Sequence, residues 1–319
     1  MDPVLFAKDL TRKPETMRAL AGILETTNPW AALPPADRYI LLGMGSSKYA
    51  ASVAAARLQA AGINAMAELA STDLLPAVTS GTVVLAISAG GGSRETKAAV
   101  NHYLGTCPVV LLTNKPESEL AESVDVVVDM YAQVEEGGVA SRSFQHTLAM
   151  LLALEVHLGV STRDVPALVR ASADACEHLL GTWCDWLPQL TERLVGPDGT
   201  HTVAPARRFS SAAQCALMLR EGPRSVAVAC ETGDWSHVDV YLTKTTDYRM
   251  LLFAGSKWED ELMRWVGERD STVAAIGGEV PGATLTIRYP GDENDDVALL
   301  TEVLIGELLA SDQWLKQQS

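Results

Sequence analysis

The sequence lacks the features of several classes of protein. Its five cysteines are scattered and form no C-x-x-C pair, and its six histidines form no H-x-x-x-H spacing. We therefore expect reduced thiols, as in the cytoplasm, and neither a bound metal nor another cofactor. No apolar run approaches the roughly 18 residues of a membrane span. The first residues, Met1–Val4, carry no basic segment followed by an apolar core, so we expect no signal peptide.

Positive charge is also scarce. The chain of 319 residues has 25 Lys and Arg against 40 Asp and Glu, a formal net charge of −15 at pH 7. Binding to nucleic acid or to an anionic membrane surface needs a positive field, so we expect neither partner. The hydrophobic fraction of 47% and the charged fraction of 20% are those of a soluble globular protein. The length allows two domains or one large α/β unit.

The strongest local signal is an apolar run followed by glycines and serines. Residues Thr82–Ile87 are rich in Val and Ile and predict a buried strand. The loop Ser88–Ser93 follows, and Ser93 is a good N-cap for a helix that begins at Arg94. This arrangement presents backbone N–H groups and a helix dipole to an anion, but it also fits a plain strand-to-helix connection. It is not a Walker A loop, because no Gly-Lys-Ser/Thr ends it.

The same pattern occurs earlier, where the expected strand Arg38–Leu42 precedes Gly43–Ser47. Short apolar strands alternate with helices along the chain, which predicts parallel sheets covered on both faces, with ligands beyond the carboxyl ends of the strands. The second half repeats this order with a period of roughly 160 residues and ends in a helix expected over 296–309. We expect an N-terminal helical segment, a first α/β domain, a helical linker and a second α/β domain, over 1–34, 35–160, 161–196 and 197–319.

Four motifs, taken in order, resemble those of a known family. They are G-x-G-S-S at Gly43–Ser47, S-x-x-G-x-S-x-E-T at Ser88–Thr96, T-N at Thr113–Asn114 and E-x-G-V-A-S at Glu136–Ser141. Together they resemble the SIS (sugar isomerase) domain, in the double arrangement of the isomerase domain of glucosamine-6-phosphate synthase and related phosphosugar isomerases. The resemblance covers about residues 35–310. It implies two SIS subdomains, each a parallel sheet flanked by helices in a flavodoxin-like three-layer sandwich.

The resemblance implies a site for the phosphate of a sugar. By motif position its hydroxyls are Ser47, Ser88 and Ser93, and the same motifs supply further substrate contacts from Gly45, Ser46, Ala89, Gly90, Val139 and Ala140. The family's second loop serine falls at Gly90, so one hydroxyl is missing. Arg142 follows V-A-S, where relatives often carry a small residue. We expect it to be a surface or interface charge, with compensation for the missing hydroxyl as the alternative.

The resemblance also places the family's catalytic glutamate at Glu221 and its ring-opening histidine at His237. Glu221 precedes a helix stop, Gly222-Pro223, where the helix dipole disfavours the charged form of a carboxylate. This placement suits a base that must also return a proton. From the residues alone, a frayed helix end whose glutamate pairs with a nearby arginine, and a solvent-facing loop histidine, are the simpler interpretations.

The sequence departs from the family in ways that bear on the reaction. A lysine expected one turn before the glutamate is Met218, and neither a glutaminase domain nor the synthase tail with its Schiff-base lysine is present, so we do not expect amide transfer. The resemblance implies a homodimer acting on a small-molecule sugar phosphate. We expect an aldose–ketose isomerase of the hexose or hexosamine 6-phosphate class. An amino-sugar phosphate deaminase or deglycase, and a non-catalytic sugar-phosphate sensor, are the alternatives.

Overall fold

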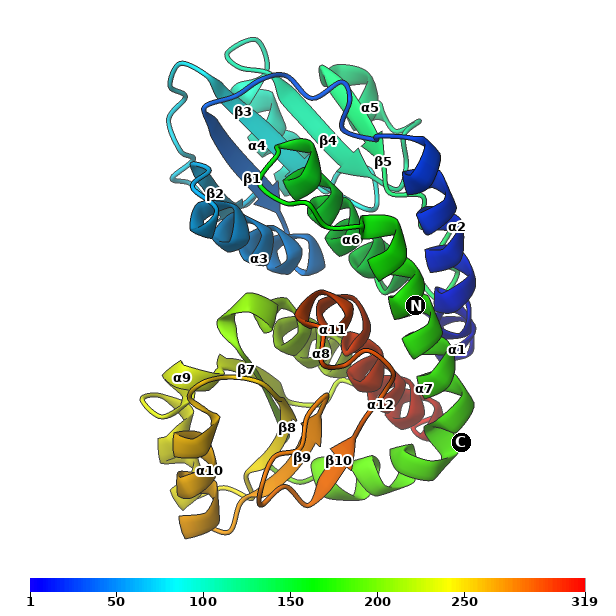
Figure 1. The fold of residues 1–319 in the computed structure, drawn as a ribbon, viewed down its shortest axis with the longest axis vertical. Coiled ribbons are helices and arrows are strands. Elements are labelled where there is room, and N and C mark those ends of the chain that lie inside the picture. Colours follow the sequence, from blue (N-terminus) through cyan, green and yellow to red (C-terminus); the bar gives the residue numbers. More distant parts are fainter. Residues whose placement is uncertain (319) are drawn as a thin grey trace. The chain divides into compact units, whose positions relative to one another are not determined.

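The computed structural model describes residues 1–318, and Figure 1 labels its elements. The chain forms two compact units, and neither is a continuous piece of sequence. Unit 1 contains Met1–Glu15, Glu136–Val139 and the chain from Arg170 onward, whereas unit 2 contains Thr16–Glu135 and Ala140–Val169. The domain boundaries expected from the sequence stay a prediction. Within residues 1–318, no helix combines the length and the apolar character needed to cross a membrane.

Unit 2 is built on a five-stranded parallel sheet with the order β2-β1-β3-β4-β5. Its strands are β1 (Arg38–Gly43), β2 (Ala65–Leu69), β3 (Thr82–Ile87), β4 (Val109–Thr113) and β5 (Val126–Asp129). Its helices are α2 (Lys13–Thr26), α3 (Ser46–Ala60), α4 (Arg94–Tyr103), α5 (Glu119–Ser123), α6 (Arg142–His157) and the first turn of α7 (Val165–Leu194).

The sheet of unit 2 is buried on both faces, as the apolar strands predict. Ile40 and Val84 pack with residues of α4 and α5 in one core cluster. Leu41 and Leu85 alternate with them along the same strands and so point to the opposite face, where they are also fully buried. The apolar run that predicted a strand is β3, the central strand of this sheet.

Unit 1 repeats this architecture. Its parallel sheet has the order β10-β9-β8-β6-β7, which reproduces the order of unit 2 when it is followed from β7. The strands are β6 (Thr200–Ala204), β7 (Ala227–Glu231), β8 (Arg249–Phe253), β9 (Thr272–Ile276) and β10 (Leu285–Ile287). The helices are α1 (Pro3–Thr11), most of α7, α8 (Phe209–Glu221), α9 (Thr232–Trp235), α10 (Glu259–Glu268), α11 (Asp295–Thr301) and α12 (Val303–Lys316). The expected α/β fold class and internal duplication are therefore confirmed.

The helix expected over 296–309 is in fact two helices, α11 and α12, which meet at Glu302. The backbone of Glu302 keeps helical angles (φ −62°, ψ −25°), but Ile305 N–H donates to the Glu302 carbonyl three residues back. The side chain of Glu302 is fully buried and pairs with Arg208, which precedes α8. Arg208 and Glu302 are 94 residues apart in the sequence, so no local sequence pattern predicts this junction.

Candidate functional site

The two serine loops of unit 2 lie next to each other at one edge of its sheet. β1 and β3 are neighbours in parallel register, with Arg38 opposite Thr82 and Leu42 opposite Ala86. Both strands therefore release the chain at the same edge, into Gly43–Ser47 and into Ser88–Ser93. The strand order changes direction between β1 and β3, and open α/β sheets bind ligands at such a point.

The first loop provides a helix N-terminus without a side-chain cap. Gly43 must be glycine, because a Cβ there would lie 2.7 Å from the carbonyl carbon of Ser47. Gly45 is the N-cap of α3, with φ +49°, and contributes no side-chain hydrogen bond. Ser46 and Ser47 form the first turn and are half-buried. Backbone N–H groups in such a turn can donate to an anion.

The second loop is held by its own serines. The hydroxyl of Ser88 accepts a hydrogen bond from Gly92 N–H at 2.8 Å, and that of Ser93 accepts one from Thr96 N–H at 3.2 Å, as expected for an N-cap. Gly91 and Gly92 have φ values of +79° and +110°, which favour glycine. Each hydroxyl uses an oxygen lone pair in these bonds, so the Ser88 hydrogen can be donated to a phosphate oxygen, while the Ser93 hydroxyl also lies 3.2 Å from the Thr96 hydroxyl.

The segment before α6 is held by residues that the sequence did not single out. The Glu135 carboxylate accepts hydrogen bonds from the N–H groups of Ser141, at 2.7 Å, and Ser143, at 3.0 Å. Arg142 is fully buried, and its guanidinium donates to the Ala132 carbonyl at 3.1 Å and to the carbonyl of Val134. The expectation of a surface or interface charge at Arg142 is therefore wrong.

Asn114 of the T-N motif fixes the same segment from the end of β4. Its side chain accepts from Ala132 N–H at 2.9 Å and donates to the Gln133 carbonyl at 2.6 Å. Tyr131 and Gln133 have φ values of +56° and +59°, a conformation that costs a non-glycine residue about 1 kcal/mol or more. The amide of Asn114 thus stabilises a strained turn on the way to the E-x-G-V-A-S motif. Within that motif Val139 is buried and Ala140 is half-buried, and the division between the two units falls between them.

Unit 1 holds the two expected catalytic residues at opposite edges of its sheet. Glu221 is half-buried at the end of α8, which runs back from the carboxyl edge of β6 to the amino edge where β7 begins. His237 is exposed and follows β7 and α9, so it lies at the carboxyl edge. The five residues of β7 span roughly 16 Å. One copy of the chain therefore keeps the Glu221 and His237 side chains apart.

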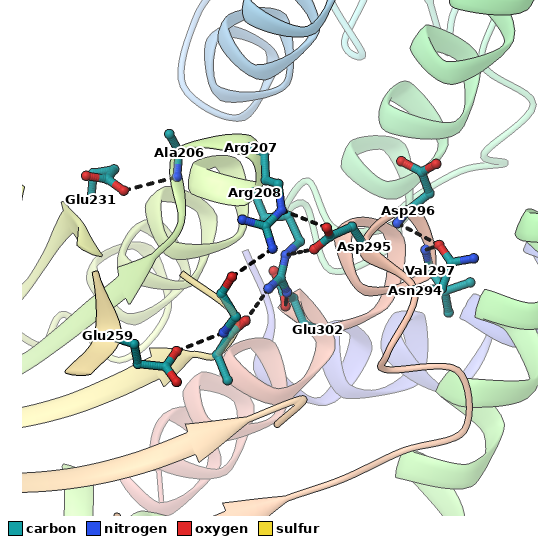
Figure 2. Close-up of polar contacts among 12 residues, drawn as sticks. Ala206, Arg207, Arg208, Glu231, Glu259, Asn294, Asp295, Asp296, Val297 and Glu302 are labelled. Carbon is teal, nitrogen blue, oxygen red and sulfur yellow. Dashed lines mark hydrogen bonds and ion pairs between the residues drawn. The ribbon is translucent and has the colours of Figure 1, made fainter. Parts of the chain in front are cut away.

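His237 lines a hollow of about 310 Å³ together with Glu231, Gly233, Asp234, Trp258 and Glu261. Glu231 is engaged within the protein. One of its carboxylate oxygens accepts from Gly233 N–H at 2.7 Å and from Asp234 N–H at 3.0 Å. The other accepts from Ala206 N–H at 3.2 Å (Figure 2). The hollow is lined by acidic side chains and one indole ring.

The edge of unit 1 that corresponds to the serine loops is occupied by ion pairs. Figure 2 shows Arg207 and Arg208, which follow β6, beside Asp295 and Glu302. Arg207 donates to Asp295 at 2.7 Å and to the Gly255 carbonyl at 2.9 Å. Arg208 is buried and pairs with both Asp295 and Glu302. Burial raises the pKa of Glu302 to about 7, although the Arg208 guanidinium acts in the opposite direction.

Two further features bear on the chemistry that is possible. Met218, at the position of the family's lysine, is 1% exposed on α8 and therefore belongs to the core. In the part of the chain that the structure describes, no group of three or more His, Cys, Asp or Glu side chains is placed to hold a metal ion.

Comparison with known proteins agrees with this architecture. Residues 32–157 match the family model described as SIS domain. A curated relative, the isomerizing glutamine–fructose-6-phosphate aminotransferase of Zymomonas mobilis, is 28% identical over 182 residues. The match covers 54% of this chain and 30% of the relative, so it spans about a third of the length of that protein.

Solved structures share the fold of the whole chain at low sequence identity. The C-terminal domain of glucosamine-fructose-6-phosphate aminotransferase from Francisella tularensis has a TM-score of 0.82 at 16% identity, over 97% of this chain and 94% of that one. Tagatose-6-phosphate ketose/aldose isomerase from Escherichia coli has a TM-score of 0.79 at 18% identity, over 98% and 93%. Glucosamine-6-phosphate deaminase from Thermotoga maritima has a TM-score of 0.75 at 18% identity, over 98% and 95%.

These likenesses establish the fold, and the family match covers both serine loops. Residues 32–157 are therefore similar to the SIS domain family, within a chain that has the two-sheet fold of the C-terminal domain of that aminotransferase.

Proposed function

We propose that this protein isomerises a phosphorylated hexose or hexosamine between its aldose and ketose forms. The observation that carries the proposal is the pairing of two glycine–serine loops at the switch point between β1 and β3. In the proposed complex the hydroxyls of Ser47, Ser88 and Ser93 donate to the phosphate. Gly45, Ser46, Ala89, Gly90, Val139 and Ala140 supply further contacts to the substrate. Holding the phosphate fixes the reacting carbons relative to the base.

In the proposed mechanism Glu221 carries the proton. Its carboxylate removes the hydrogen from C2 of the open-chain aldose as a proton, the electron pair forms the C1–C2 double bond, and the C1 carbonyl π electrons move to O1, which gives an enediolate. The same carboxyl group then delivers the proton to C1 while the hydroxyl proton of O2 passes to O1, which yields the ketose without a net change in protons. His237 assists ring opening beforehand. General acid–base catalysis of this kind contributes typically about 10²–10⁴-fold to a rate.

The separation of Glu221 and His237 supports a homodimer. The two side chains lie at opposite edges of one sheet, so a site containing both requires His237 from a second copy. Light scattering at micromolar concentration tests this requirement. A monomer that is nevertheless active would exclude the shared site.

The decisive experiment replaces Glu221 with glutamine and follows the C2 proton of hexose and hexosamine 6-phosphates by NMR in D₂O. We expect the wild type to exchange this proton and Glu221→Gln to lose about 10²–10⁴-fold in rate. Affinity for inorganic phosphate should change little, because the serine loops stay intact. Undiminished exchange in the variant would show that another group carries the proton.

The proton-exchange assay also tests two alternative functions. The fold shared with the Thermotoga deaminase supports an amino-sugar phosphate deaminase or deglycase, which would release ammonia from glucosamine 6-phosphate or from a glycated amine. The buried Met218 and the missing hydroxyl at Gly90 support a sugar-phosphate sensor without catalysis. A sensor would bind hexose 6-phosphates and exchange no proton from any of them.

A further inference from the structure

The end of α8 rests on α12. Gly306 of α12 allows the two helices to approach closely, because a Cβ at this position would overlap the sulfur of Cys215. Two turns further along α8, the helix ends at Glu221 and its C-cap Gly222. A Cβ on Gly222 would lie 3.0 Å from the Trp314 ring, so the indole covers the backbone next to Glu221.

Further contacts from α12 hold the chain beyond this cap. Gln317 donates to the Pro223 carbonyl at 2.7 Å, and Ser225 donates to the Gln313 side chain at 3.2 Å. The helix end thus has partners on both sides of the Gly222-Pro223 stop. Free helix ends fray, and a frayed end would spread the position of a terminal carboxylate over several ångströms.

Trp314 also contacts α1. The rings of Phe6 and Trp314 lie 6.0 Å apart between centroids at 50°, and their side chains are 1% and 9% exposed. A buried ion pair of 2.6 Å between Lys13 and Glu307 joins the segment after α1 to α12. The N-terminal helix is therefore packed firmly on the helix that supports Glu221.

The same face of α1 holds part of the E-x-G-V-A-S motif. Gly137 N–H donates to Asp9 at 2.7 Å, and the Gly137 carbonyl accepts from Asp2 N–H at 3.1 Å. A Cβ on Gly137 would lie 2.6 Å from the Phe6 backbone, so only glycine fits. These contacts explain why Glu136–Val139 belongs to unit 1 although its sequence neighbours belong to unit 2.

We infer that Trp314 is a positioning residue. It fixes the end of α8, and with it the Glu221 carboxylate, relative to α1 and the loop Glu136–Val139. This inference rests on the proposed function, because it assigns Trp314 a role only through the base. Displacement of a catalytic group by about 1 Å can cost 10²-fold in rate, so a ring that holds a helix end can govern turnover without touching the substrate.

The test compares Trp314→Ala with Trp186→Ala, which removes an equally buried indole from α7 of the same unit; the two rings are 9% and 8% exposed. We expect Trp314→Ala to lower kcat for C2 proton exchange by about 10–100-fold with KM within about twofold. Trp186→Ala should keep kcat within about twofold even where its melting temperature falls. Trp314→Phe keeps an aromatic ring against Gly222 and should recover most of the lost kcat.

A double-variant cycle separates positioning from a general loss of structure. In the Glu221→Gln background, Trp314→Ala should cause no further loss of exchange, because the group it positions is already gone. Equal kcat values for Trp314→Ala and Trp186→Ala, or additive losses in the double variant, would overturn the inference. Absence of exchange in the wild type would overturn the proposed function itself, and the assigned role of Trp314 with it.

Discussion

Single residues determine how well the serine loops can hold an anion. Gly90 interrupts the family's run of hydroxyls, yet an added Cβ there meets no described atom within 4 Å, and its φ is not in the left-handed region. Gly91, the next residue, has a φ of +79°, and a Cβ on it would lie 2.7 Å from that of Ser118. The two adjacent glycines therefore differ: the first tolerates a side chain and the second does not.

Gly90→Ser should restore the missing hydroxyl and tighten phosphate binding. One hydrogen bond of about 0.5–1.5 kcal/mol corresponds to an affinity gain of about 2–10-fold. Calorimetric titration with inorganic phosphate and with hexose 6-phosphates measures the change. Gly91→Ser is the matched control and should lower stability without improving affinity. A folded Gly90→Ser protein with unchanged affinity would show that the phosphate does not lie beside this loop position.

At the scale of helices and strands, the local pattern predicted most of the fold. β3 and the end of α8 lie where the apolar run and the helix stop at Gly222-Pro223 placed them. The junction of α11 and α12 and the short helix α9 were not predicted. The junction is buried through the pair between Arg208 and Glu302, and neither residue signals the other locally.

The same contrast applies to the candidate site. The serine loops were predictable, because a parallel sheet gathers the carboxyl ends of its strands at one edge. The burial of Arg142 was not, because it depends on carbonyl groups of a turn that Asn114 holds in place. The placement of Glu221 and His237 at opposite edges follows from the order β6, α8, β7 in a parallel sheet.

The buried pair at the start of α12 should make stability depend on pH. The folded state raises the pKa of Glu302 from its usual value near 4.5 to about 7, so the unfolded chain loses this proton at lower pH than the folded chain. The stability that this group contributes is complete below about pH 4.5 and is lost as the pH rises to 7. Glu302→Gln removes this titration.

Urea denaturation of wild type and Glu302→Gln at pH 5 and pH 8 tests the expectation. Between these values the wild type should lose more unfolding free energy than the variant, by an amount on the order of 2 kcal/mol. Asp295→Asn changes the exposed partner of Arg208 and should leave the pH dependence of the wild type in place. Parallel curves for wild type and Glu302→Gln would contradict a raised pKa at this position.

At the scale of the whole molecule, a shared site predicts complementation between inactive copies. Glu221→Gln and His237→Asn each remove one of two residues that the proposed dimer supplies from different chains. A mixed dimer contains one site lacking both and one site in which both are intact. Mixing the variants after dissociation should therefore restore exchange above that of either alone, up to about a quarter of the wild-type rate for random pairing and equal mixing.

The expected recovery follows from counting sites, since half of the dimers are mixed and each has one complete site of two. His237→Asn alone should retain more activity than Glu221→Gln, because the open-chain fraction of the substrate bypasses ring opening. Failure of the mixture to exceed its components would place both residues in one chain or exclude His237 from the reaction.

The packing of α1 on α12 also has a consequence for synthesis of the chain. Phe6, Asp9 and Lys13 leave the ribosome before either sheet, but the partners of Phe6 and Lys13, Trp314 and Glu307, are translated only after both sheets. During that interval the Phe6 ring and the Lys13 ammonium group are exposed to water or bound by a chaperone. The folded protein buries both groups. Completion of unit 1 therefore waits for α12, and a chain halted before Val303 lacks the contacts that bury the Phe6 ring.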